Sequence, residues 1–199
     1  MPHNSKSDLS SPLQSEGNDI APEPDSPVSS EPHDSQDDDS IIWQFSNHIT
    51  VENTITYQPW ADILDDDFQK DASLLVDFFA GILESDSFDI SCQWTDDARM
   101  RRLNHEFRGQ DKPTNVLSFP DGFDGHIGDL AFGYQIMKQQ ADEMNISVGH
   151  HARHLFIHGL LHLAGYDHHE NDEAEDMEAL EIAALSLVGV ANPYQGELA

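Results

Sequence analysis

Three histidines in the last quarter of the chain have the residue type and the spacing of a metal-ion site. His158 and His162 are four residues apart in an apolar segment. On a helix this separation turns the side chain by only about 40°, so both imidazoles would lie on one face, one turn apart. Gly165 would let the backbone reverse, so that His168 can return toward the same ion. The spacing therefore predicts one divalent ion per chain, held by His158, His162 and His168.

Three imidazole ligands would leave at least one coordination position of the ion open. Open positions are typical of catalytic rather than structural zinc sites. Water bound at such a position has a lowered pKa and supplies hydroxide near neutral pH. We therefore predict Zn²⁺ as the cofactor, with another divalent ion as the alternative.

Several polar residues adjoin the three histidines. Asp167 is expected either to accept the N–H of a ligating imidazole and fix its tautomer, or only to form the turn. His169 is expected in an exposed turn, with a place as fourth ligand as the alternative. Three further histidines upstream on the same helix are expected in solvent or behind the ligands: His150, His151 and His154.

The histidine pair also resembles the helical zinc motif of metallopeptidases, with one difference. Those enzymes carry His-Glu-x-x-His, in which the Glu is the general base. Here the residue after the first histidine is Gly159. Without that carboxylate the peptidase mechanism has no base, so a different chemistry or a different acid–base group is expected.

Positive charge is concentrated in one segment of a very acidic chain. The 199 residues include 9 Lys and Arg against 38 Asp and Glu, a formal net charge of −29. Such a chain does not attract nucleic acid as a whole, because phosphate binding needs a basic surface. Five cations nevertheless fall between positions 99 and 112: Arg99, Arg101, Arg102, Arg108 and Lys112. Arg101, Arg102 and Lys112 are predicted to contact RNA; the alternative for the arginines is a salt-bridged helix face.

Arg108 has a position of its own in this segment. It stands where a helix is expected to give way to a loop, and Gly109 beside it permits a ligand to approach closely. A guanidinium can bind phosphate through two parallel hydrogen bonds and can stabilise negative charge that develops in a transition state. Arg108 is therefore the predicted catalytic residue.

Apolar periodicity after residue 40 predicts strands and helices in mixed order, the pattern of an α+β or mixed α/β domain. Strands are expected over 41–55, 88–94, 116–119 and 127–132, with a turn at Pro120-Asp121-Gly122. Helices are expected over 71–84, 96–107, 135–144, 148–164 and from 171 onward. Thr95 and Ser147 are the expected N-caps of two of them.

Residues 1–40 differ from the rest of the chain. They contain six prolines, ten serines and ten acidic residues with one lysine. Such a segment buries too little apolar surface to offset its ordering entropy, so a disordered acidic tail is predicted, followed by one domain over 41–199. The single cysteine excludes an intramolecular disulfide, and no stretch approaches the roughly 18 apolar residues of a membrane span. A cytoplasmic location without membrane contact is the resulting expectation.

Three blocks of sequence resemble the YbeY family of endoribonucleases, also called rRNA maturation factors. The first is His158-Gly159-x-Leu161-His162-Leu163-x-Gly165-Tyr166-Asp167-His168. The second comprises Leu103-Asn104, Phe107-Arg108 and Pro113-Thr114-Asn115-Val116-Leu117-Ser118-Phe119-Pro120, and the third is Gly128-Asp129-Leu130. The resemblance covers roughly residues 48–190. One departure is Asn115, where the family usually has aspartate; we expect a structural effect more than a loss of activity.

The resemblance implies a fold, an activity and partners. The fold would be a compact α+β domain with a small mixed sheet packed by helices, and the zinc-type ion would be held by the three histidines, with Arg108 near it. The activity would be single-strand-specific cleavage of RNA in the maturation of small-subunit (16S) rRNA and in ribosome quality control. The partners would be rRNA, the small ribosomal subunit and its proteins, and an Era-type GTPase.

Two other classes of function stay open at this point. One is a zinc metalloprotease-like hydrolase, which the helix-borne histidine pair suggests and Gly159 disfavours. The other is a non-enzymatic ribosome-assembly factor whose ion is structural. A structural ion would need four protein ligands, so His169 or Asp167 would have to complete the site.

Overall fold

The computed structural model describes residues 39–45 and 48–195. The predicted tail therefore lies outside the described residues, except for its last two positions. Those two, Asp39 and Ser40, belong to a strand: they pair with Ile55 and Thr54, and the Ser40 hydroxyl donates to Glu52 Oε1 at 3.2 Å. Ladder hydrogen bonds thus extend the ordered domain two residues beyond the boundary expected from composition.

A five-stranded mixed sheet forms the centre of the described domain. Its strands are β1 (Asp39–Gln44), β2 (Ile49–Ile55), β3 (Phe88–Thr95), β4 (Val116–Phe123) and β5 (His126–Gly133). They lie in the order β1-β2-β3-β5-β4. The β1–β2 and β4–β5 pairs are antiparallel, whereas β2–β3 and β3–β5 are parallel. The predicted α+β class with a small mixed sheet is confirmed.

The described residues also form five α-helices. They are α1 (Asp66–Leu83), α2 (Asp97–Arg108), α3 (Tyr134–Met144), α4 (Val148–Leu163) and α5 (Asn171–Leu187). A short 3-10 segment, Gln58–Trp60, precedes α1. Ser147 caps α4 as expected, since its side chain accepts from His150 N. None of the described helices is both long enough and apolar enough to cross a bilayer.

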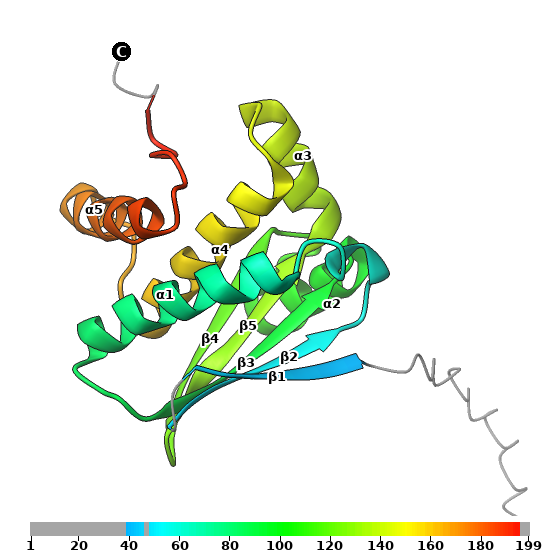
Figure 1. The fold of residues 1–199 in the computed structure, drawn as a ribbon. Coiled ribbons are helices and arrows are strands. Elements are labelled where there is room, and N and C mark those ends of the chain that lie inside the picture. The colour runs from blue at the N-terminus through cyan, green and yellow to red at the C-terminus, as the bar shows by residue number, and fades with distance from the viewer. Residues whose placement is uncertain (1–38, 46–47, 196–199) are drawn as a thin grey trace, which may run out of the picture. The chain divides into compact units, whose positions relative to one another are not determined.

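The two faces of the sheet carry different layers (Figure 1). On one face, alternate residues of β3 such as Ile90 and Trp94 join the main core with residues of α1 and α4, including Phe68 and Phe156. Helix α2 packs on the other face over a smaller cluster of Met100, Leu117 and Ala131. Among the described helices, α2 is the one that contributes to this cluster, and Ser91 and Gln93 of β3, which point to the same face, stay partly exposed.

Three local predictions were wrong. The single strand expected over 41–55 is two antiparallel strands, β1 and β2. The expected turn at Pro120-Asp121-Gly122 is part of β4, and the chain reverses at Asp124-Gly125, both of which have positive φ. β4 is an edge strand, where a proline needs no ladder partner for its missing N–H, and the register shifts between Pro120 and Phe123. The predicted N-cap Thr95 instead ends β3, and Asp96 caps α2 by accepting from Arg99 N at 2.8 Å.

Close contact with β4 and β5 fixes the position of α4. Gly159 faces the sheet: a Cβ there would lie 3.0 Å from Leu130 Cδ2, and Ser118 Oγ donates to the Gly159 carbonyl at 3.3 Å. At the end of α4, Leu163 lies over Gly128, where a Cβ would come within 2.8 Å of its Cδ2. After the helix, Gly165 has φ +87°, so the predicted left-handed C-terminal residue is confirmed.

Candidate metal centre

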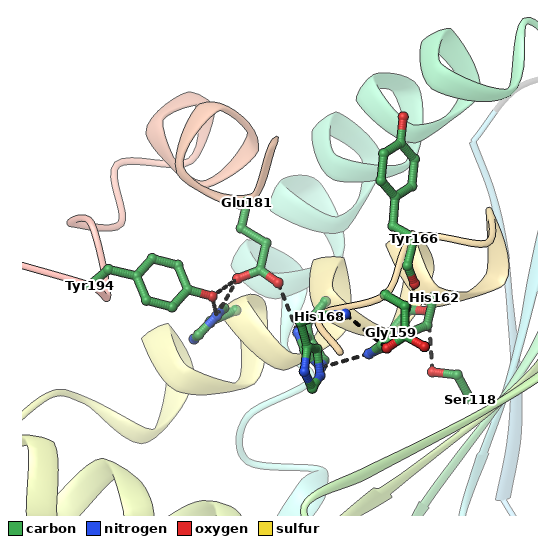
Figure 2. Close-up of polar contacts among 10 residues, drawn as sticks. Ser118, Gly159, His162, Tyr166, His168, Glu181 and Tyr194 are labelled. Carbon is green, nitrogen blue, oxygen red and sulfur yellow. Dashed lines mark hydrogen bonds and ion pairs between the residues drawn. The ribbon is translucent and has the colours of Figure 1, made fainter. Parts of the chain in front are cut away.

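The structure brings His158, His162 and His168 together, as predicted. Each offers a ring nitrogen, and the three atoms lie within 4.8 Å of one another. Two histidines come from one face of α4, and His168 returns through the turn at Gly165 (Figure 2). The Nε2 atoms of His158 and His162 are 3.1 Å apart. That separation suits two ligands of one ion, each at about 2.1 Å from it.

Hydrogen bonds fix the tautomers of the two helical histidines. His162 Nδ1 lies 2.9 Å from the Tyr166 carbonyl oxygen, which can only accept, so Nδ1 carries the proton. His158 Nδ1 likewise donates to Glu181 Oε1 at 2.8 Å. Both Nε2 atoms therefore present lone pairs to each other. Two lone pairs at 3.1 Å repel unless a cation lies between them, so this donor set fits a divalent ion.

His162 stays neutral in this environment. Burial and, to a smaller extent, the neighbouring His158 together lower its pKa to about 4, although the bond to the Tyr166 carbonyl acts in the opposite direction. A neutral imidazole is the form that binds a metal ion, because a protonated ring has no free lone pair.

Glu181 is a site residue that the sequence analysis missed. It lies on α5, is only 1% exposed, and receives hydrogen bonds from His158 Nδ1 at 2.8 Å and His154 Nε2 at 2.7 Å. The Tyr194 hydroxyl also donates to it (Figure 2). Burial raises the pKa of Glu181, but the bonds from His154 and His158 outweigh burial and bring it to about 2. A buried carboxylate thus stays ionised behind a candidate metal ligand.

Asp167 has the second of the two roles expected for it, which is to form the turn. Asp167 accepts from His168 N at 2.8 Å and pairs with His169 at 3.1 Å; among the described residues it has no hydrogen bond to a ring of the three histidines. The tautomer-fixing contacts come from Glu181 and the Tyr166 carbonyl instead. The backbone bond from His168 lowers the pKa of Asp167. Asp167 thus shapes the turn that carries His168.

The upstream histidines are not equivalent. His150 is exposed, whereas His151 is buried and lies with Nε2 3.1 Å from Gln140 Oε1. His154 supports Glu181, as described above. His169 is exposed and lies outside the cluster of ring nitrogens found among the described residues.

The basic segment maps to α2 and the loop after it. Arg108 is the last residue of α2 and is exposed, followed by Gly109 with φ +68°. Arg102 and Lys112 are exposed as well. Arg101 differs, because its Nε and an Nη donate to the two carboxylate oxygens of Asp111 at 2.6 and 2.7 Å. That ion pair partly neutralises Arg101, so Arg102 and Lys112 are better placed to meet a phosphate.

Asn115 has a structural role. Its Oδ1 accepts from Val116 N at 2.7 Å and its Nδ2 donates to Gln140 Oε1 at 2.9 Å. Gln140 Oε1 is the atom that also faces His151. Asn115 therefore ties the start of β4 to α3 and, through Gln140, to α4.

A cavity of about 310 Å³ opens beside the histidines. Its lining includes His158, His168, Glu181 and residues of α5 such as Met177 and Glu178. The cavity leaves the histidine cluster accessible from the side of α5, which a substrate group would need.

Fold and site together define the class of the protein: an α+β domain with a three-histidine site suited to a divalent ion. A family model described as Endoribonuclease YbeY matches residues 54–189. The chain therefore belongs to the YbeY family, as the sequence blocks indicated.

Individual relatives agree with this assignment. An endoribonuclease YbeY of Sphingopyxis alaskensis is 40% identical over 154 residues, covering 68% of this chain and 92% of that protein. The one of Rhodopseudomonas palustris is 45% identical over 117 residues, covering 55% of this chain and 62% of the relative. The solution structure of a Thermotoga maritima protein has a TM-score of 0.51 at 25% identity, covering 71% of this chain and 87% of that one.

Proposed function

We propose that this protein is a metal-dependent endoribonuclease that cleaves single-stranded RNA during maturation of small-subunit rRNA and in ribosome quality control. The observation that carries the proposal is the convergence of two lone pairs, on His158 and His162 Nε2, beside His168. Relatives named endoribonuclease YbeY support cleavage of RNA as the reaction.

The residues of the chain have separate roles in this proposal. His158, His162 and His168 would hold the ion, with zinc as the first choice. When bound, such an ion supplies an acidified water and polarises a phosphoryl oxygen. Glu181 and the Tyr166 carbonyl keep the Nε2 atoms of His158 and His162 free to bind it. Arg108 would bind the phosphate and offset the negative charge that develops on it.

The attacking group can be identified from the products. A 2′,3′-cyclic phosphate terminus would show that the ribose 2′-hydroxyl attacks. A 5′-phosphate opposite a 3′-hydroxyl would show that water attacks. Mass spectrometry of a cleaved single-stranded oligonucleotide distinguishes these termini.

Two exposed neighbours provide a matched test. His168→Ala removes one proposed ligand from the surface and should abolish both metal retention and RNA cleavage. His169→Ala removes a ring of the same type one residue later and should leave both unchanged. Cleavage that persists in metal-free His168→Ala would point to a contaminating nuclease and would refute the assignment.

The same pair of variants addresses the alternative of a structural ion. If His169 were a fourth ligand, His169→Ala would lose the ion as His168→Ala does, and the wild-type protein would not cleave RNA. The metalloprotease alternative is disfavoured further by the fold, because the position of Gly159 faces Leu130 and the sheet. A side chain there would point into the core, away from a substrate.

Binding partners and location form part of the proposal. We propose rRNA and the small ribosomal subunit as partners, with its proteins and an Era-type GTPase as further ones. Copurification of the tagged full-length chain with ribosomal subunits would test this. The cytoplasmic location stays a prediction.

A further inference from the structure

A groove of about 310 Å³ lies on the face of the sheet that α2 only partly covers. Its floor is formed by Thr54, Ser91 and Gln93, from β2 and β3, and its wall by Leu103 and Phe107 of α2 with Phe119 of β4. Ser91 and Gln93 alternate with the core residues of β3, so they point away from α1 and α4. The groove is therefore separate from the cavity beside the histidines.

The wall of the groove is aromatic and exposed. Phe107 is 60% exposed, and its ring meets that of Phe119 edge to face, with centroids 4.9 Å apart. An aromatic ring left this open has a face available for a planar ligand. Protein aromatic side chains stack on unpaired nucleobases in this way, with little dependence on sequence.

The floor of the groove supplies polar groups without partners. Within the described residues, the side chains of Thr54, Ser91 and Gln93 make no hydrogen bond. Asp129, on the rim, is held by His126 through only one oxygen, at 3.1 Å. A planar ligand that stacks on Phe107 could thus form hydrogen bonds through its edge, as a nucleobase does.

The charge next to the groove is complementary to an RNA backbone. Among the described residues, five cations have no ion pair, and four of them lie on α2 or in the loop after it: Arg99, Arg102, Arg108 and Lys112. The rest of the chain is strongly acidic. A polyanion is therefore favoured at this helix over the remaining surface, and an uncharged or acidic peptide is not.

The groove and the histidine-bearing turn share one edge of the sheet. Phe119 and Asp129 are register partners in β4 and β5. Gly128, next to Asp129, is covered on the opposite face by Leu163, the last residue of α4. Only the sheet thus separates the groove from the helix end that leads to His168, and β4 is its edge strand.

We propose that this groove is a binding site for one unpaired nucleobase of the RNA, stacked on Phe107. It deepens the proposed function by naming a substrate contact away from the histidines. It also accounts for the side chains of Leu103, Phe107, Phe119 and Asp129, which belong to sequence blocks that the metal centre does not use.

The test uses the full-length chain with Phe107→Trp as a reporter. The three native tryptophans, Trp43, Trp60 and Trp94, are buried, so a tryptophan at position 107 would be the exposed one among those described. Stopped-flow mixing with a short single-stranded RNA should quench its fluorescence before cleavage occurs. An oligonucleotide of equal length and charge without bases should bind without quenching.

A matched reporter and a truncation complete the test. Leu187→Trp places a tryptophan at another exposed apolar position, on α5, and should not be quenched. Phe107→Ala should weaken binding of the base-containing RNA about tenfold and leave binding of the abasic strand unchanged. Equal quenching at positions 107 and 187, quenching by the abasic strand, or quenching by an aromatic peptide but not by RNA would overturn the proposal. If RNA were cleaved but did not quench the tryptophan at position 107, only the proposal of a nucleobase site in the groove would be refuted. If RNA quenched this tryptophan but was not cleaved, only the proposed nuclease activity would be refuted.

Discussion

The Nδ1 bonds of His158 and His162 decide what their Nε2 atoms can do. A histidine in a helix can present either nitrogen, and only the acceptor on the other side selects one. Here one acceptor is a backbone carbonyl, at Tyr166, and the other is the Glu181 carboxylate. The two acceptors differ in charge, so Glu181 should also increase the basicity of the ring that it holds.

Glu181→Gln tests this role. We expect metal affinity to fall about 10- to 100-fold, because the ring of His158 loses its charged partner. Competition with a chromogenic chelator measures the affinity. Glu175→Gln removes an exposed carboxylate from the same helix and should leave the affinity within twofold. An unchanged affinity in Glu181→Gln would mean that the carboxylate serves only the packing of α5.

His151 should make stability depend on pH. Burial and, to a smaller extent, His154 and His158 together lower its pKa from 6.5 to about 4, so the unfolded chain binds a proton more readily than the folded one. The stabilisation is complete above about pH 6.5 and should be lost as the pH falls toward 4, by about 3 kcal/mol. Urea unfolding at several pH values gives the free energy of unfolding as a function of pH. This free energy should change less steeply with pH in His151→Gln than in the wild-type protein. If the free energy of unfolding changed equally steeply with pH in both proteins, a group other than His151 would cause the pH dependence.

Part of the site could not be recognised in the sequence, because Glu181 is one of several glutamates in the same segment. Glu181 lies in a helix that also contains Glu173, Glu175 and Glu178, so it resembles one more solvated carboxylate. Only the packing of α5 on α4 makes it buried. The histidine cluster could be predicted because its spacing is local, whereas the Glu181 contact joins residues 23 positions apart.

At the scale of elements, helix ends could be predicted from local sequence, whereas the hairpin at the edge of the sheet could not. The boundaries of α4 follow from Ser147 and Gly165, whose capping roles are local. The position of the chain reversal between β4 and β5 does not follow from local sequence. Pro120 is compatible with a strand only at the edge of a sheet, and whether β4 lies at the edge depends on the strand order, which is a tertiary property.

The approach of α4 to the sheet depends on Gly128. A Cβ there would collide with the Phe119 carbonyl oxygen and lie 2.8 Å from Leu163 Cδ2, and φ is +147°. We expect Gly128→Ala to lower the free energy of unfolding by about 2 kcal/mol or more. Gly122→Ala, in the same hairpin but with nothing within 4 Å of its Cβ position, should change it by less than about 0.5 kcal/mol. Denaturant titration measures the free energy of unfolding of both variants. Equal changes would mean that the backbone of the hairpin shifts and relieves the collision at position 128.

The whole molecule combines a negative net charge with cations gathered on one helix. Repulsion by the acidic surface should oppose RNA everywhere except along α2, so the charge distribution selects the face that RNA approaches. Composition showed the imbalance, and the position of α2 on the less covered face of the sheet came only from the fold. The predicted acidic tail adds to the imbalance, but all of it except Asp39 and Ser40 lies outside the described residues.

Metal binding should stabilise the whole domain. At an ion concentration about 100-fold above Kd, the stabilisation is about 2.7 kcal/mol, which raises Tm by roughly 5–10 °C in a domain of this size. Differential scanning fluorimetry with and without Zn²⁺ measures the shift. His169→Ala should retain it and His168→Ala should lose it. A shift that persists in His168→Ala would place the stabilising ion elsewhere.

The contacts of Glu181 and Tyr194 with α4 link the end of the chain to the metal centre. An ion that orders His158 would thereby hold down α5, so removing it should loosen that helix before the sheet opens. Amide hydrogen exchange should then speed up in α5 on chelation while β3 stays protected. Binding of the ion would in this way keep α5 packed on α4, and the availability of metal would determine how resistant the protein is to proteolysis.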